Sequence, residues 1–482
     1  MLPPMNVPRP PEPEAARPDP AAVAAEAVRR ADAAMKARRL GEAIGICQDV
    51  LETLPDYPPA LALLGSVIGH KGEIEQAIDL LARACARHDG NASWFNNLAT
   101  LCRVACRMDE ALAAAERAAA LAPGQPGIVL NLAKVRLDRG EYDPAIAGFL
   151  DVLAREPENA EAHLALGQIL LMRGDTHAGW YEYEWRNRLE QARGTLPAMP
   201  RPQWNGMRLP GSALLLVGDQ GFGDTIQFAR LIPRVAERVG KVYLGSAPEL
   251  EALLRPIPGV AGCWHRWQDI PAHGVYCRLS SVPALTALRF DELPGPMPYL
   301  AADPTLAATW RARLDERTGP RRPRVGLVWA GRTSHPNDRR RSLRLAQIAP
   351  ITAQRGVSFV SLQRPVPAHD AAEFAGLSHI LDLSAELTDF SVTAAVMANL
   401  DLVITVDSSV AHLAGALGRP GWVLMPRPAD WRWLAEGSES AWYPSLRLFR
   451  QPAPGDWAPA IAAAAWSLSR LVQPPATLSA AD

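Results

Sequence analysis

A period of 34 residues runs through the first third of the chain and constrains its fold more than any other feature. Four kinds of residue recur at this step: an alanine, a Pro or Asp, a Leu followed by a small residue, and a glycine. The columns are Ala43, Ala77, Ala111 and Ala145; Pro55, Asp89, Pro123 and Pro157; Leu64, Leu98, Leu132 and Leu166; and Gly72, Gly140 and Gly174. Such a repeat is one supersecondary unit that buries its apolar face by stacking on its neighbours. We therefore expect helix-turn-helix units near 24–57, 58–91, 92–125 and 126–159, with a less regular fifth unit continuing to about 190.

The repeated unit resembles the tetratricopeptide repeat (TPR). This resemblance implies an α-superhelix whose concave face binds an extended ligand. The arm is similar to that of the O-GlcNAc transferases, in which Asn side chains on this face hold peptide. Asn97 and Asn131 share one repeat position here and are candidate acceptor-binding residues, since a carboxamide both donates and accepts hydrogen bonds. The alternative is that each Asn bonds only to its neighbours.

Beyond the repeats, apolar strands and helical segments alternate. We expect strands at 213–217, 241–245, 260–264, 324–329, 357–362, 401–406 and 420–425, and helices near 224–239, 247–255, 343–353, 389–399 and 409–417. This alternation predicts two doubly wound α/β lobes. The expected domains are a disordered Pro-rich lead-in (1–20), the TPR superhelix (21–192), a linker (193–211), an N-terminal lobe on the acceptor side (212–315), a C-terminal lobe on the donor side (322–472) and a disordered tail (473–482). The aromatic segment 179–189 is expected to fasten the superhelix to the next domain.

A Gly-rich loop, GDQGFGD, follows the first predicted strand of the N-terminal lobe. Its glycines Gly221 and Gly223 let the backbone approach a ligand at the carboxyl edge of a sheet and are candidate donor-binding residues. The dinucleotide-binding fingerprint is incomplete, because Ile226 stands where its third glycine belongs. Asp224 ends the loop and is either a helix cap or a group that acts on a ligand in the cleft.

Two segments of the predicted C-terminal lobe are suited to bind phosphate. One lies at a helix N-terminus, which favours anions, and supplies Asp407, Ser408, Ser409 and His412. The other, residues 321–344, contains eight Arg and one acid. Guanidinium groups clamp pyrophosphate, so the candidate donor-binding residues of this run are Arg332, Arg339, Arg340 and Arg341. A solvated basic face is the alternative for the arginines, and helix packing is the alternative for His412.

Residues 401–426 resemble the donor motif of the ADP-heptose:lipopolysaccharide heptosyltransferases (glycosyltransferase family 9). The matching positions are Asp407, Ser408, Ser409, His412, Leu413, Gly415 and Ala416. The Gly-Asp loop of that family is matched by Gly223 and Asp224. The segments QGFGDTIQFARLIP, DLSAELTDF and DWRW (430–433) also resemble a bacterial group of TPR-linked glycosyltransferases.

These resemblances imply a GT-B pair of Rossmann-like lobes that moves a hexosyl or heptosyl group from a nucleotide-diphosphate sugar to a hydroxyl of a protein or glycan acceptor. The TPR arm would hold part of the acceptor, and Asp224 would be the general base of an inverting reaction. No metal or other cofactor is expected, because GT-B transferases usually work without a metal and the chain has no DxD motif. The alternatives are a non-catalytic TPR scaffold with a degenerate nucleotide-sugar-binding domain, and an epimerase or hydrolase on the same fold.

Composition argues against several other classes. The formal net charge is -1, so no global field favours nucleic acid as a partner. No apolar run reaches the roughly 18 residues that a membrane span needs. The six cysteines form no CxxC pair and suggest no zinc site. We therefore expect a soluble, cytoplasmic protein.

Overall fold

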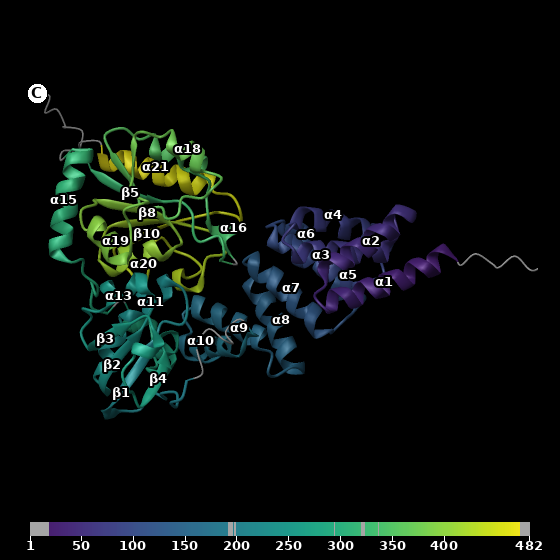
Figure 1. Cartoon of the computed structure of the whole chain (residues 1–482), viewed down its shortest axis with the longest axis horizontal. Coiled ribbons are helices and arrows are strands. Elements are labelled where there is room, and N and C mark those ends of the chain that lie inside the picture. Colours follow the sequence, from purple (N-terminus) through teal and green to yellow (C-terminus); the bar gives the residue numbers. More distant parts are fainter. Residues whose placement is uncertain are drawn as a thin grey trace, which may run out of the picture. The chain divides into compact units, whose positions relative to one another are not determined.

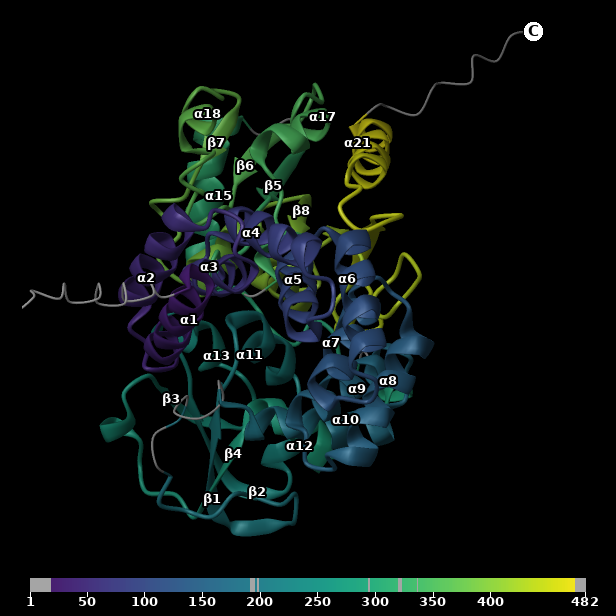
Figure 2. The same cartoon turned by 90° about the vertical axis from the view of Figure 1, so that its right-hand side faces the viewer.

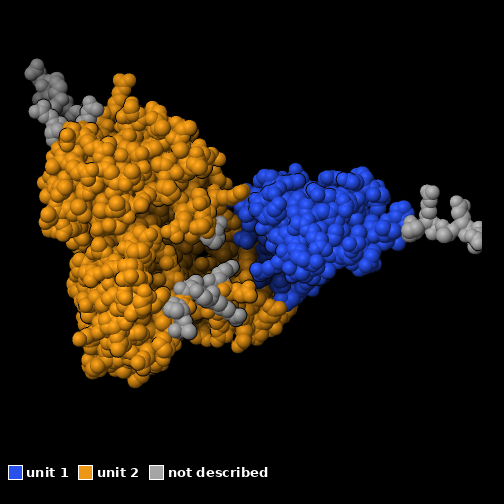
Figure 3. All heavy atoms as spheres, in the orientation of Figure 1, with its two compact units in different colours: residues 1–132 blue, residues 133–482 orange. Residues whose placement is uncertain are grey.

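The computed structural model describes residues 19–190, 196, 199–293, 295–319, 323–335 and 337–472. Most of the expected lead-in and the whole of the expected tail lie outside these residues. The chain divides into two compact units, residues 1–132 and residues 133–482 (Figure 3). The second unit contains the last repeats together with both lobes, so its boundary falls inside the repeat region and well before residue 192.

Each expected repeat is a pair of helices. The pairs are α1 (Pro20–Lys36) and α2 (Leu40–Thr53); α3 (Pro58–His70) and α4 (Ile74–Arg87); α5 (Ala92–Val104) and α6 (Met108–Leu121); α7 (Pro126–Asp138) and α8 (Tyr142–Arg155); and α9 (Ala160–Met172) and α10 (Thr176–Tyr183), followed by η1 (Glu184–Arg188).

The repeat columns have clear structural roles. The four alanines of the first column are each 0% exposed, because they lie where one helix meets the next. The glycine column lies in the turn of each pair and has positive φ. Cys106 takes the place of glycine in the third pair and has a φ of 62°, so the backbone of the turn, and not the residue type, is what repeats.

The N-terminal lobe is built on a parallel sheet. Its elements are β1 (Leu209–Val217), α11 (Phe222–Ala229), α12 (Ile232–Ala236), β2 (Val239–Gly245), α13 (Pro248–Leu254), β3 (Val260–Trp264), η3 (Trp267–Asp269), β4 (Val275–Arg278), η4 (Leu279–Ser281), α14 (Val282–Leu285) and η5 (Phe290–Glu292). Within the described residues the strand order is β3-β2-β1-β4, and every pairing is parallel.

The C-terminal lobe has a larger parallel sheet. Its elements are α15 (Pro304–Thr318), β5 (Arg324–Val328), α16 (Asp338–Arg341), η6 (Leu345–Ile348), α17 (Ala349–Thr352), β6 (Ser358–Ser361), α18 (Ala371–Ala375), β7 (Ile380–Asp382), α19 (Phe390–Met397), β8 (Leu402–Val406), α20 (Ser409–Ala416), β9 (Gly421–Met425), η7 (Trp431–Trp433), β10 (Leu446–Arg450) and α21 (Ala458–Val472). The order among the described strands is β10-β9-β8-β5-β6-β7, which is the doubly wound order with its switch point between β5 and β8.

Helices cover both faces of this second sheet. Val325 and Leu327 pack in a cluster with residues of α17 and α21 on one face, whereas Val328 and Val403 pack with residues of α19 and α20 on the other. Figure 1 shows α21 and α19 on opposite sides of the strands. The sheet is therefore buried on both sides, as the continuous apolar runs of its strands predict.

The structure departs from the sequence-based expectations in several elements. Strands β4, β7 and β10 were not expected; β4 and β7 are only four and three residues long, too short to show a period. The helix expected at 224–239 is broken into α11 and α12. Pro233 lies in the first turn of α12, where its missing N–H is tolerated, whereas it could not donate within a continuous helix. Helix α15 was not expected, and most of it falls in the range 212–315 assigned to the N-terminal lobe. It is instead held to the C-terminal lobe, where Asn399 donates to the carbonyl of Ala307 at 2.8 Å.

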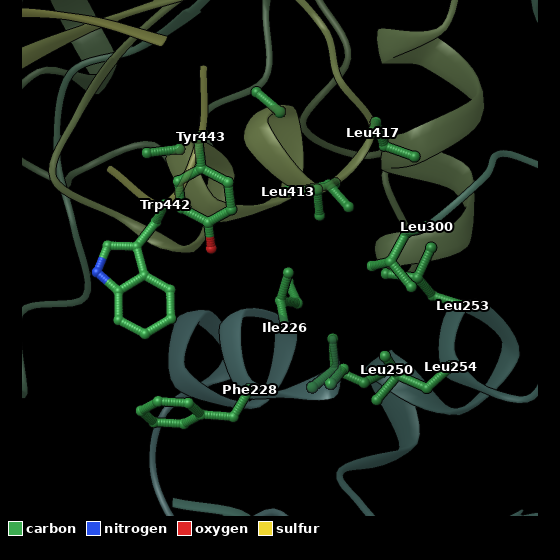
Figure 4. Packing of buried hydrophobic residues seen from close by; sticks show 14 of the residues in the cluster. Ile226, Phe228, Leu250, Leu253, Leu254, Leu300, Leu413, Leu417, Trp442 and Tyr443 are labelled. Carbon is green, nitrogen blue, oxygen red and sulfur yellow. The ribbon is translucent and has the colours of Figure 1, made fainter. Parts of the chain in front are cut away.

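The two lobes share one hydrophobic core. Helices α11 and α13 lie between the two sheets in both orientations (Figure 1, Figure 2). In this layer Ile226 of the N-terminal lobe faces Leu413 and Tyr443 of the C-terminal lobe, and Phe228 lies below Trp442 (Figure 4). These residues are each 0% exposed, so the lobes are packed together without a water-filled gap at this point.

The last repeat is fastened to the N-terminal lobe, as the aromatic segment 179–189 predicts. Trp180 of α10 is buried, and its indole donates to the carbonyl of Leu288 at 2.8 Å. The buried guanidinium of Arg186 donates to the hydroxyls of Ser280 and Ser281 at 2.7 and 2.8 Å. Apolar and polar contacts thus hold α9 and α10 to the lobe that carries the Gly-rich loop.

Candidate active site

A cavity of about 720 Å³ lies between the lobes. It is lined by residues of the loops that follow β1, β5, β6, β8 and β9, so the carboxyl ends of strands from both sheets meet there. Ligands of open α/β sheets bind at this edge, beside the switch point of the strand order. The cavity therefore has the position expected of a ligand site in this fold.

Asp224 lines this cavity at the start of α11, beside Gly221 and Gly223. Its Oδ2 accepts a hydrogen bond from the backbone N–H of Gly221 at 3.0 Å, so the carboxylate caps the helix. Its Oδ1 pairs with Arg432. Burial raises the pKa of Asp224 above the ordinary value for aspartate. Asp224 therefore combines both roles that the sequence left open, a cap and a carboxylate facing the cavity.

Residues 407–412, at the start of α20 in the other lobe, also line the cavity, except for Ala411, and lie directly against the Gly223 end of the Gly-rich loop. Ser408 is the N-cap, and its hydroxyl accepts from the N–H of Val410 at 3.3 Å. Asp407 accepts from the indole of Trp433 at 2.9 Å, and burial raises its pKa to about 6. The carboxylate of Asp407 is thus held in place beside the helix N-terminus.

His412 is buried beside Gly223. Its Nδ1 lies 2.9 Å from the hydroxyl of Tyr443, and its ring stacks on Trp433 with centroids 5.3 Å apart. Burial and neighbouring guanidinium groups hold its pKa well below the ordinary value, so the ring is neutral at physiological pH. The residue both packs against helices and contributes to the cavity wall.

The structure separates the four candidate arginines. Arg332, Arg340 and Arg341 line the cavity, whereas Arg339 is exposed and does not. Arg340 is engaged by Asp138 at the end of α7, with Nη2 2.6 Å from Oδ2. Arg341 lines the cavity with its side chain, and its buried Nε has no hydrogen-bond partner among the described residues.

Asn97 and Asn131 have different environments. Asn97 is exposed and donates to the hydroxyl of Ser66 at 3.2 Å. Asn131 is 7% exposed and donates to the carbonyl and side-chain oxygens of Asn96 at 3.1 and 3.0 Å. The amide of Asn131 thus makes the local bonds that were the alternative to ligand binding, and the two residues do not form an even ladder.

Several residues of the cavity were missed by the sequence analysis. Asp430 and Arg432 appeared there only as letters of a shared motif, and the repeats contribute Leu137, Asp138, Gln168 and Met172. The period gives one signal for the second group, because Asp138 and Met172 are 34 residues apart and occupy the same repeat position. Only the tertiary structure shows that this repeat position lines the cavity.

Family models match two parts of the chain. Tetratricopeptide-repeat families match residues 70–126 and 107–169, and glycosyltransferase family 9 (heptosyltransferase) matches residues 314–424. Protein FlbA of Caulobacter vibrioides is 28% identical over 435 residues, which cover 82% of this chain and 70% of FlbA.

Solved structures match over a smaller part of the chain. MamA is 20% identical with a TM-score of 0.32 over 37% of this chain and 100% of MamA. PilF of Pseudomonas aeruginosa is 19% identical with a TM-score of 0.32 over 35% of this chain and 77% of its own. Likeness at this level carries no argument about function.

The chain thus combines tetratricopeptide repeats with two Rossmann-like lobes, of which the second contains the region that matches glycosyltransferase family 9. This chain is a glycosyltransferase with a family 9 domain. None of the helices in the described part of the chain has both the length and the hydropathy of a membrane span. The described His, Cys, Asp and Glu side chains include no group of three or more suited to hold a metal ion.

Proposed function

We propose that this glycosyltransferase moves a sugar from a nucleotide-diphosphate sugar to a hydroxyl group of a protein or glycan, with inversion at the anomeric carbon and without a bound metal. One observation carries the proposal: Asp224 of one lobe and the N-terminus of α20 of the other line the same cavity. A carboxylate base and an anion site on one cavity are what this transfer needs.

The donor diphosphate is proposed to bind at residues 407–412. The N-terminus of α20 carries a partial positive charge, and the Ser409 side chain lines the cavity at its first turn. Arg341 supplies a guanidinium with an unsatisfied buried Nε, and Arg332 lines the same wall. These groups stabilise the negative charge that develops on the leaving diphosphate.

The reaction is proposed to proceed in one displacement. Asp224 takes the proton of the acceptor hydroxyl as its oxygen bonds to the anomeric carbon. The bond from that carbon to the diphosphate oxygen breaks, and the electron pair leaves on the nucleoside diphosphate. The contacts to Gly221 and Arg432 leave room for this role, because a carboxylate has about four acceptor positions.

The acceptor is proposed to enter along the repeats. Gln168 and Met172 of α9, together with Leu137 of α7, form part of the cavity wall. The inner helices of the last repeats therefore end at the catalytic groups, and an acceptor bound by the TPR arm can present its hydroxyl to Asp224. Asn97, which is exposed on α5, is proposed separately as an acceptor-binding residue of the repeats.

The donor site predicts metal-independent binding. In calorimetry with a panel of nucleoside diphosphates, at least one should bind with the same affinity in EDTA as in Mg²⁺, because protein groups neutralise the diphosphate. Arg341→Met should weaken this binding about 10-fold or more, as expected for losing a hydrogen bond to a charged group. The matched control is Arg339→Met, an exposed neighbour outside the cavity. Binding that EDTA abolishes, or an equal loss in both variants, would contradict the assigned site.

The repeat wall predicts an effect on the acceptor alone. Gln168→Ala should raise the acceptor KM several-fold and leave the Kd of the nucleoside diphosphate unchanged, because Gln168 lies on the side of the cavity formed by the repeats. Gln76→Ala is the control, since Gln76 is exposed on α4 and does not line the cavity. Steady-state kinetics with the acceptor varied is the measurement. If KM stays at the wild-type value, the acceptor enters by another face.

A further inference from the structure

Arg432 links the two lobes through Asp224, the proposed general base. It lies in η7 of the C-terminal lobe, is 7% exposed, and reaches into the N-terminal lobe. Its Nη2 pairs with Asp224, its Nη1 donates to Asp430 at 2.8 Å, and its Nε donates to the side-chain oxygen of Gln227 at 2.7 Å. The guanidinium thus has one partner on its own element and two on α11.

The segment that carries Arg432 is held firmly. Asp430 also accepts from the backbone N–H of Arg432 at 3.0 Å, and the guanidinium lies over the Trp431 ring at 4.3 Å from the centroid. Leu434 directly after η7 has a φ of 58°, a strained conformation for a branched side chain. Arg450 of β10 stabilises this turn by donating to the carbonyls of Trp433 and Leu434 at 2.5 and 3.2 Å.

We infer that Arg432 is a positioning residue for the base. The fork of the guanidinium fixes one oxygen of the Asp224 carboxylate, so that the base is correctly oriented only while the two lobes are packed together. This inference rests on the proposed role of Asp224 as the base. The described side-chain hydrogen bonds of Arg432 go to Asp224, Gln227 and Asp430, which fits a positioning role.

Asp224 needs a cationic partner because its other surroundings disfavour the ionised carboxylate. The other charged groups that act on Asp224 are Asp430 and Asp219, and both raise its pKa, as burial does. Arg432 is the cation that opposes them. A base must be ionised to accept a proton, so Arg432 keeps Asp224 in its working form to lower pH than burial alone would permit.

The test uses Arg432→Gln, with Arg432→Lys as a second variant that keeps the charge but not the fork. The probe is a water-soluble carbodiimide with an amine, which labels protonated carboxyls, and the extent of labelling at Asp224 is read by mass spectrometry across pH. In Arg432→Gln, loss of the cation should move the midpoint of labelling upward by about 1–3 pH units. In Arg432→Lys, the retained charge should keep the midpoint close to that of the wild type. Turnover should fall about 10²-fold in the Gln variant, as expected when a reacting group is misplaced.

The control is Arg230→Gln. Arg230 is another inter-lobe arginine, which donates to the carbonyls of Gln227 and Trp442 at 3.2 and 3.0 Å. It should lose stability without moving the labelling midpoint at Asp224.

The inference is overturned if Arg432→Gln keeps the wild-type midpoint. It is also overturned if both Arg432→Gln and Arg432→Lys keep full turnover. If Arg432→Gln does not fold, Arg432→Lys with wild-type midpoint and wild-type turnover overturns it instead. If the midpoint moves but Asp224→Asn retains full activity, the pairing stands and the proposed base fails.

Discussion

Asp224→Asn should lower kcat by at least about 10²-fold while leaving the Kd of the nucleoside diphosphate unchanged. The amide keeps the size of the side chain and can still accept from the N–H of Gly221, so the helix cap survives. It cannot take a proton from the acceptor. Donor binding is unaffected because the diphosphate site lies on α20 in the other lobe. Single-turnover kinetics with calorimetry separates the two effects.

Glu249→Gln is the matched control for this change. Glu249 is a second carboxylate of the N-terminal lobe that lines the cavity, and it lies on α13 away from the Gly-rich loop. Its loss should leave kcat close to wild type. An Asp224→Asn protein that melts at lower temperature but turns over normally would show that Asp224 only caps the helix. In the wild type, activity should be lost as pH falls through the pKa of Asp224, which burial has raised above that of an ordinary aspartate.

Gly223→Ala should lower kcat by about 10²-fold through the addition of a single methyl group. A Cβ at this position would lie 2.6 Å from Cδ2 of His412 and 3.4 Å from Cα of Ser409. The start of α11 therefore touches the start of α20 so closely that a methyl group must push them apart. Because Asp224 is the next residue, the separation moves the base away from the donor site.

Gly211→Ala is the control, since nothing lies within 4 Å of a Cβ at Gly211 on β1 of the same lobe. Its kinetics should match those of the wild type. Turnover and thermal unfolding are measured for both variants. Wild-type turnover in Gly223→Ala would mean that transfer does not depend on the close approach of the two helices, and the proposed coupling of lobe packing to catalysis would have to be abandoned.

Much of the architecture was accessible from the sequence because it depends on local patterns. The 34-residue period gave the helix pairs, and the alternation of apolar runs and helical segments gave the two lobes with their longer strands. The Gly-Asp loop and the segment 407–412 could be placed at strand ends for the same reason, since the carboxyl edge of a parallel sheet is defined by chain direction. Short strands such as β7, with three residues, carry too little pattern to be found this way.

The partners of the charged side chains were decided only by the tertiary structure. Nothing in the arginine run distinguishes Arg340, which pairs with Asp138 of a repeat 202 positions earlier, from Arg341, whose Nε is left unsatisfied beside the cavity. The pairing of Asp224 with Arg432 spans 208 positions and two lobes. Sequence by itself determined which chemical groups stand at each strand end, because backbone direction and periodicity are local. Which of those groups meet depends on how separate elements pack, and no local pattern encodes that packing.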